Sequence, residues 1–200
     1  MFTRFGVISY EDYPGSFDSS VCGTSSYSAT YGDSGDSPFD LRTALDADPA
    51  VSQETINALT LGGGNDGPES YGRAFWEVAQ ADTPIGWRPD ALKLVLNFGD
   101  NVPHDPNINE GVSSSVVDTG LDPGRNGVID CGGDDIDFQD GALAALESAG
   151  IRLLHVEQSS TGFEANWRYW TSLTGGAYTT LSGERTLSDV VIELLGLVDG

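Results

Sequence analysis

The chain has 200 residues, of which 9 are basic and 31 acidic, so its formal net charge at pH 7 is −22. A field of this sign repels nucleic acid and anionic membranes and attracts cations, so we expect neither nucleic-acid binding nor membrane insertion. The apolar fraction of 38% and the aromatic fraction of 10% predict a single folded domain over residues 1–200. Such a composition is typical both of secreted, calcium-loaded proteins and of proteins from the cytoplasm of salt-adapted organisms.

The two cysteines, Cys22 and Cys131, leave two alternatives open. They form one disulfide in an oxidising compartment, or they remain as two free thiols in a reducing one. No stretch is long enough to span a membrane. The opening residues lack the apolar core of a signal peptide and have the alternation of a strand instead.

The first half of the chain is predicted to contain short elements separated by polar loops. Residues 4–10 alternate and are rich in β-formers, which predicts a strand. Residues 11–37 are rich in Ser, Gly, Asp and Tyr without a helical period, which indicates a long loop or an elaborated hairpin. We expect a short edge strand over residues 38–45 and a short helix over residues 52–59, with Ser52 as its N-cap.

The second half alternates helices with strands. Helices are expected from Pro68 onward, over residues 141–150 and 166–176, and after Thr186; strands are expected over residues 91–98, 151–158 and 177–181. The last helix begins with a capping box formed by Thr186 and Asp189. Residues 91–98 are almost continuously apolar, as in a central strand covered on both faces. This order predicts an α/β fold with a doubly wound, mostly parallel sheet and helices on both faces.

Three acidic residues are expected to converge at one rim of this sheet. Asp66 and Glu69 lie in the glycine-rich stretch GGGNDGPES, and Asp100 follows the strand at residues 91–98. Ligands of parallel sheets bind beyond the carboxyl ends of the strands. Carboxylates gathered there repel one another unless a cation lies among them. The pattern predicts a divalent-cation site with Glu69 as the main direct ligand, although an acid in a first helical turn is also favoured by the helix dipole alone.

These segments resemble a von Willebrand factor A domain, most closely the integrin β-subunit variety. Asp66, Pro68 and Glu69 are similar to the D-x-P-E loop of that family. Residues 85–104 are similar to the following strand and its approach, and they end at His104, four residues after Asp100. Residues 149–158 and 171–181 are similar to the next strand and to the Thr-Gly-Gly turn that follows it. The resemblance covers most of the chain in order.

The resemblance implies a metal-ion-dependent adhesion site that binds Mg²⁺ or Mn²⁺. A carboxylate of a protein or glycan partner would complete the coordination shell. Glu69 would be a metal ligand, Asp100 would coordinate directly or through water, and Asp66 would serve an adjacent calcium site or steady the loop. Asn65 and His104 would lie at the rim, where a polar loop residue is the alternative interpretation of His104. It also implies an extracellular or cell-surface location within a larger protein.

One motif of this family is missing from its expected place. The first metal motif, D-x-S-x-S, should precede the strand at residues 4–10, so the chain resembles an N-terminally truncated domain. Residues 18–22 and 33–37 match the motif only in part and come after that strand, which indicates solvated loop serines.

An acidic insertion over about residues 101–139 contains a second candidate site. Asp122, Asn126 and Asp130 carry oxygens spaced around a glycine turn, as in a calcium loop. The EF-hand pattern fails, because Gly124 replaces an oxygen ligand and Gly133 replaces the bidentate glutamate. The pattern therefore favours a plain acidic turn over a calcium loop.

The leading functional hypothesis is a divalent-cation-dependent adhesion domain without chemical turnover. One alternative is a calcium-stabilised structural module of a larger secreted protein. Another is a metal-dependent hydrolase, against which the lack of a recognisable nucleophile and of a histidine cluster argues.

Overall fold

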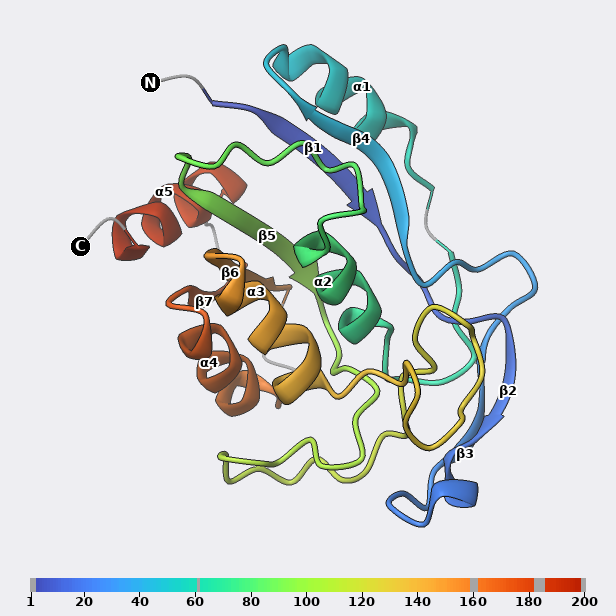
Figure 1. Cartoon of the computed structure of the whole chain (residues 1–200). Helices are drawn as coiled ribbons and strands as arrows, with labels where there is room; N and C mark the ends of the chain where they lie inside the picture. Colours follow the sequence, from blue (N-terminus) through green and yellow to red (C-terminus); the bar gives the residue numbers. More distant parts are fainter. Residues whose placement is uncertain (1–2, 61, 159–161, 182–185, 199–200) are drawn as a thin grey trace.

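The computed structural model describes residues 3–60, 62–158, 162–181 and 186–198. The elements are short and follow one another in the order shown in Figure 1. They are β1 (Phe5–Ser9), β2 (Gly15–Asp18), the 3₁₀ helix η1 (Ser19–Cys22), β3 (Ser28–Gly32), β4 (Asp40–Asp46), α1 (Pro49–Ala58), α2 (Tyr71–Ala79), β5 (Lys93–Gly99), the π-helix η2 (Phe138–Leu143), α3 (Ala144–Ser148), β6 (Ile151–Glu157), α4 (Glu164–Leu173), β7 (Ala177–Thr180) and α5 (Leu187–Val198).

The described strands form three separate sheets. One is a three-stranded parallel sheet in the order β5-β6-β7, and the other two are the antiparallel pairs β1-β4 and β2-β3. The prediction of a doubly wound, mostly parallel sheet is therefore wrong. Parallel neighbours need crossover connections, and these contain η2 and α3 between β5 and β6 and α4 between β6 and β7. In the first half, β2 and β3 form a hairpin, and β1 and β4, which flank that hairpin in the sequence, pair antiparallel.

The prediction that residues 91–98 form a central strand is also wrong. Its counterpart β5 lies at the edge of the parallel sheet, and the side chains of Leu96 and Phe98 are 36% and 49% exposed. The central strand is β6, where Leu153 and Leu154 are buried on opposite faces. An apolar run alone thus did not distinguish an edge strand from a central one.

The main core lies between the parallel sheet and the helices α2, α3 and α4. Trp167 and Trp170 of α4 are fully buried and pack edge to face, with ring centroids 5.0 Å apart. A smaller cluster joins Val190 and Leu194 of α5 to Leu154 and Val156 of β6. No helix in the described part of the chain is long and apolar enough to cross a membrane.

The helix starts show which capping signals were decisive. Asp48, not Ser52, caps α1, because its carboxylate accepts a hydrogen bond from the Ala50 amide (2.9 Å) and Pro49 occupies the first turn. Helix α2 begins at Tyr71 rather than at Pro68. The capping box before α5 is confirmed, because Thr186 and Asp189 exchange hydrogen bonds between side chain and backbone amide.

The polar segment 11–37 contains the hairpin β2-β3, and a disulfide attaches it to the acidic insertion. Cys22, at the end of η1, is bonded to Cys131 across a sequence separation of 109 residues. The structure thus contains the bridged form of the two cysteines.

Candidate metal centre

Three potential metal ligands converge at the carboxyl ends of β1 and β5. Asp12 follows β1, Asp66 lies in the turn before α2, and His104 lies in the segment after β5; one ligand atom of each is within 4.8 Å of the other two. Figure 1 shows β1 and β5 running in the same direction. A hydrogen bond from the Tyr10 hydroxyl to Asn97 Oδ1 (2.7 Å) keeps their ends together.

Backbone hydrogen bonds fix the loops that carry these side chains. The Glu69 amide donates to the Val102 carbonyl (2.9 Å), and the His104 amide donates to the Glu69 carbonyl (3.3 Å). The Asn65 amide donates to the Tyr31 carbonyl of β3 (3.0 Å). The turn before α2 is therefore held between β3 and the segment after β5.

The orientation of the His104 imidazole is determined by its surroundings. Nδ1 lies 2.7 Å from the Thr119 carbonyl oxygen, which can only accept, so Nδ1 carries the proton. Nε2 faces Asp12 Oδ1 at 3.2 Å, and the residue is fully buried. Metal-ligating histidines commonly donate their other ring N–H to a carbonyl in this way.

The two carboxylates of the cluster each have an oxygen without a donor. Asp12 is fully buried; its Oδ1 accepts a hydrogen bond from Ser70 Oγ (2.8 Å), but its Oδ2 has no partner within the described residues. Asp66 Oδ2 accepts from the Tyr27 hydroxyl (3.0 Å), whereas its Oδ1 is buried and likewise unpartnered in this part of the chain. A buried charged oxygen without a donor is costly, so the site favours a positive species between these groups.

The pKa shifts of the acidic groups and of His104 also indicate that the site favours positive charge. Burial raises the pKa of Asp66 to about 6 and that of Glu69 to about 8, and the negative charge of Asp12 adds to both effects, while His104 acts in the opposite direction. Burial by itself lowers the pKa of His104, but its hydrogen bond to Asp12 and the charges of Asp12 and Asp66 raise that pKa above its ordinary value overall. The site thus attracts a proton or, in its place, a metal cation.

The predicted triad of acids is only partly gathered in this centre. Asp66 belongs to the cluster, but the one group of three metal-ligand atoms found in the described residues does not include Glu69 or Asp100. Glu69 is half-buried and lies close enough for the charge of Asp100 to raise its pKa, and Asp100 is exposed. Asn65 points its amide nitrogen to Asp33 Oδ1 (2.7 Å), outside the cluster.

Asp12 is the one member of this group that the sequence analysis did not identify as a candidate site residue. It follows the strand at residues 4–10, just as Asp100 follows the strand at residues 91–98. Its place at a strand end was the available signal, because the carboxyl ends of strands that run side by side meet at one rim.

Hydrogen bonds from inside and outside the acidic insertion hold the residues of its candidate calcium loop. Asp122 is fully buried and accepts from the Tyr13 hydroxyl (2.7 Å) and from the amides of Gly124 (3.0 Å) and Arg73 (2.8 Å). Asn126 Nδ2 donates to Asp130 Oδ2 at 3.3 Å. Protein donors therefore occupy the Asp122 carboxylate that a calcium loop would use.

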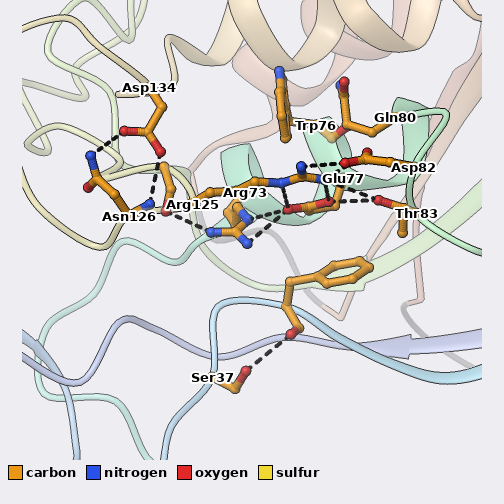
Figure 2. A network of polar contacts seen from close by, with 12 residues as sticks. Ser37, Arg73, Trp76, Glu77, Gln80, Asp82, Thr83, Arg125, Asn126 and Asp134 are labelled. Carbon is orange, nitrogen blue, oxygen red and sulfur yellow. Dashed lines mark hydrogen bonds and ion pairs between the residues drawn. The ribbon is translucent and has the colours of Figure 1, made fainter.

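Arginine side chains anchor this insertion to α2 (Figure 2). Arg125 makes two hydrogen bonds of 2.7 Å to Glu77 and two, of 2.7 and 3.0 Å, to Asp82. Its guanidinium lies over the Trp76 ring, 4.9 Å from the centroid, and Arg73 also pairs with Glu77. Such forked pairing lowers the pKa of Glu77 despite its burial.

Two carboxylates and one imidazole at one rim make a candidate divalent-metal centre. Imidazole and carboxylate are both common ligands of divalent ions in proteins.

No protein-family model matches the chain, and no curated protein matches it either. The chemistry of the cluster therefore carries the functional argument.

Proposed function

We propose that the chain is a divalent-cation-dependent binding domain whose cation is held by Asp12, Asp66 and His104. The observation that carries this proposal is the pair of buried, unpartnered carboxylate oxygens of Asp12 and Asp66 beside an imidazole nitrogen. A cation there would replace the missing donors and neutralise the negative charge. Mg²⁺, Mn²⁺ and Ca²⁺ are the ions to which the resemblance to adhesion domains points.

The rim beside this cation would receive the partner. Glu69 is half-buried next to the cluster, and Asp100 is exposed at the end of β5. A bound cation offers an attractive point for a carboxylate of a protein or glycan, because it is the one positive group among several acids. Binding by coordination requires no chemical turnover, so the domain would act as an adhesion module rather than as an enzyme.

A structural role for the cation is the second candidate function. The three ligands come from three separate segments, and Asp12 and His104 are fully buried. A cation at this position would tie these segments together even without a partner, as in a module of a larger exported protein. The disulfide between Cys22 and Cys131 supports export, because such bonds persist in oxidising compartments.

Calorimetric titration of the metal-free protein with each divalent ion tests the cation site. We expect Asp12→Asn to weaken binding by at least about tenfold, or ~1.4 kcal/mol. Asp90→Asn is the matched control and should leave binding unchanged, because Asp90 is exposed and precedes the amino end of β5, whereas the cluster lies beyond its carboxyl end. Equal affinities for the two variants would refute the proposed site.

Glycan and peptide arrays then separate the two functions. Cation-loaded protein retained on carboxylate-bearing ligands, and released by a chelator, supports the adhesion function. Thermal stabilisation by the cation without any chelator-sensitive retention supports the structural module instead.

A further inference from the structure

The ligand set contains a nitrogen, and that nitrogen is aimed by a fixed hydrogen bond. Because His104 Nδ1 donates to the Thr119 carbonyl (2.7 Å), the lone pair of a neutral imidazole lies on Nε2, on the side of Asp12. Tyr31 stacks on the ring with centroids 3.8 Å apart and prevents it from turning away. A site that binds a hard cation through oxygen ligands alone would not need an oriented imidazole nitrogen.

We propose that the centre is selective for a zinc-class ion over Mg²⁺ and Ca²⁺, with Asp12, Asp66 and His104 as its protein ligands. This inference rests on the proposed cation site and specifies its ion. Imidazole suits Zn²⁺ and its neighbours among the transition metals, whereas Mg²⁺ and Ca²⁺ prefer carboxylate, carbonyl and water oxygens.

The ligand atoms of the three residues lie close enough to share one ion, because they are all within 4.8 Å of one another. His104 Nε2 lies 3.2 Å from Asp12 Oδ1, which also accepts a hydrogen bond from Ser70 Oγ. The second oxygen of Asp12, Oδ2, has no hydrogen-bond partner among the described residues. Asp66 Oδ1 is buried, without a hydrogen-bond partner among the residues that the structure describes, and so it is free to serve as the third ligand.

The rest of the chain offers few competing ligands of this class. The sequence contains two histidines and two cysteines. Both cysteines are consumed by the disulfide. The other histidine, His155, is fully buried, lies with Nδ1 2.8 Å from Asn97 Nδ2, and is stacked on Trp167 at 3.6 Å. An imidazole signal from bound zinc would therefore identify His104.

The test combines titration of the metal-free protein with X-ray absorption at the zinc edge. Wild-type protein should bind Zn²⁺ at least about 100-fold more tightly than Mg²⁺ or Ca²⁺. The absorption spectrum should show one imidazole and a remaining shell of oxygens. His104→Gln should lose at least about tenfold in Zn²⁺ affinity with no loss in Ca²⁺ affinity, and His104→Asp, which supplies an oxygen ligand, should shift the preference toward Ca²⁺.

The outcomes separate this inference from the proposed function. Similar affinities for the three ions, or a zinc spectrum without imidazole, would overturn the zinc preference while leaving a cation site in place. If Asp12→Asn binds every ion as the wild type does, the proposed site fails and the inference fails with it. The absorption measurement on wild-type protein remains decisive even if the His104 variants do not fold.

Discussion

The phenol ring of Tyr31 is stacked on the imidazole of His104, with the ring centroids 3.8 Å apart and the ring planes 10° from parallel. Tyr31 belongs to β3 and is fully buried, and its hydroxyl is 3.2 Å from both Ser19 Oγ and the Leu121 carbonyl oxygen. The hairpin β2-β3 therefore positions the imidazole of the candidate metal centre, whose carboxylates come from different segments. Support of this kind governs how well a metal ligand is aimed.

Replacing Tyr31 should weaken cation binding without removing any ligand. Tyr31→Leu keeps much of the volume but loses the flat ring, so we expect the affinity for the preferred ion to fall about 10- to 100-fold. Tyr31→Phe retains the stacked ring and should bind almost as tightly as the wild type. Calorimetry on the folded variants measures both, and an undiminished affinity of Tyr31→Leu would show that the stack does not orient His104.

The metal-free protein should lose stability as the pH rises from about 4.5 to about 8. Burial, with the charges of Asp12 and Asp100, raises the pKa of Glu69 from its ordinary 4.5 to about 8 in the folded state. Below pH 4.5 the carboxyl group is protonated in both states, so its contribution is fully present there. Between the two values the folded state binds more protons than the unfolded state, so the free energy of unfolding falls with rising pH.

The variant Glu69→Gln isolates this effect. It cannot ionise, so its denaturant midpoint should decline less steeply with pH than that of the wild type. Urea titrations at several pH values, with a chelator present, provide the comparison. Parallel curves for the two proteins would mean that Glu69 ionises normally in the folded state.

The central strand should be far more sensitive to truncation than the edge strand. Leu153 of β6 is fully buried, whereas Leu96 of β5 is 36% exposed. Leu153→Ala should therefore cost about 2–5 kcal/mol of unfolding free energy, and Leu96→Ala should cost about 1 kcal/mol or less. Chemical denaturation measures both, and similar losses would indicate that β5 is covered in solution.

The sequence predicted most elements but not their arrangement. Strands at residues 151–158 and 177–181 and the capping box of Thr186 and Asp189 depend on local signals, and the structure contains them. Whether residues 91–98 form a central or an edge strand depends on pairing between distant segments, which an apolar run does not encode. The rim was predicted through Asp66, but Asp12 carries no local motif, and only the folded chain brings it to His104.

The anchoring of the acidic insertion by Arg125 should contribute measurably to stability. Glu77 is only 5% exposed and accepts two hydrogen bonds from Arg125. Arg125→Ala should lower the free energy of unfolding by about 1–3 kcal/mol, because a nearly buried carboxylate loses charged donors. Arg168→Ala is the control: its pair with Glu164 is exposed on both sides and should be worth less than about 1 kcal/mol. Equal losses in thermal or chemical denaturation would contradict an anchoring role.

Reduction of the bond between Cys22 and Cys131 should destabilise the protein and loosen the metal centre. The bond closes a long loop, with a sequence separation of 109 residues, and loss of such a constraint typically costs about 2–5 kcal/mol. It also ties η1, next to the strand pair that carries Tyr31, to the acidic insertion, so cation affinity should fall on reduction. Denaturation and metal titration with and without a phosphine reductant test both effects, and the double variant Cys22→Ser/Cys131→Ser should behave like the reduced protein.

Thiol titration of the unreduced, denatured protein should find no reactive thiol. Two reactive thiols in protein from its native host would show that the bond does not form there, and they would remove its support for export.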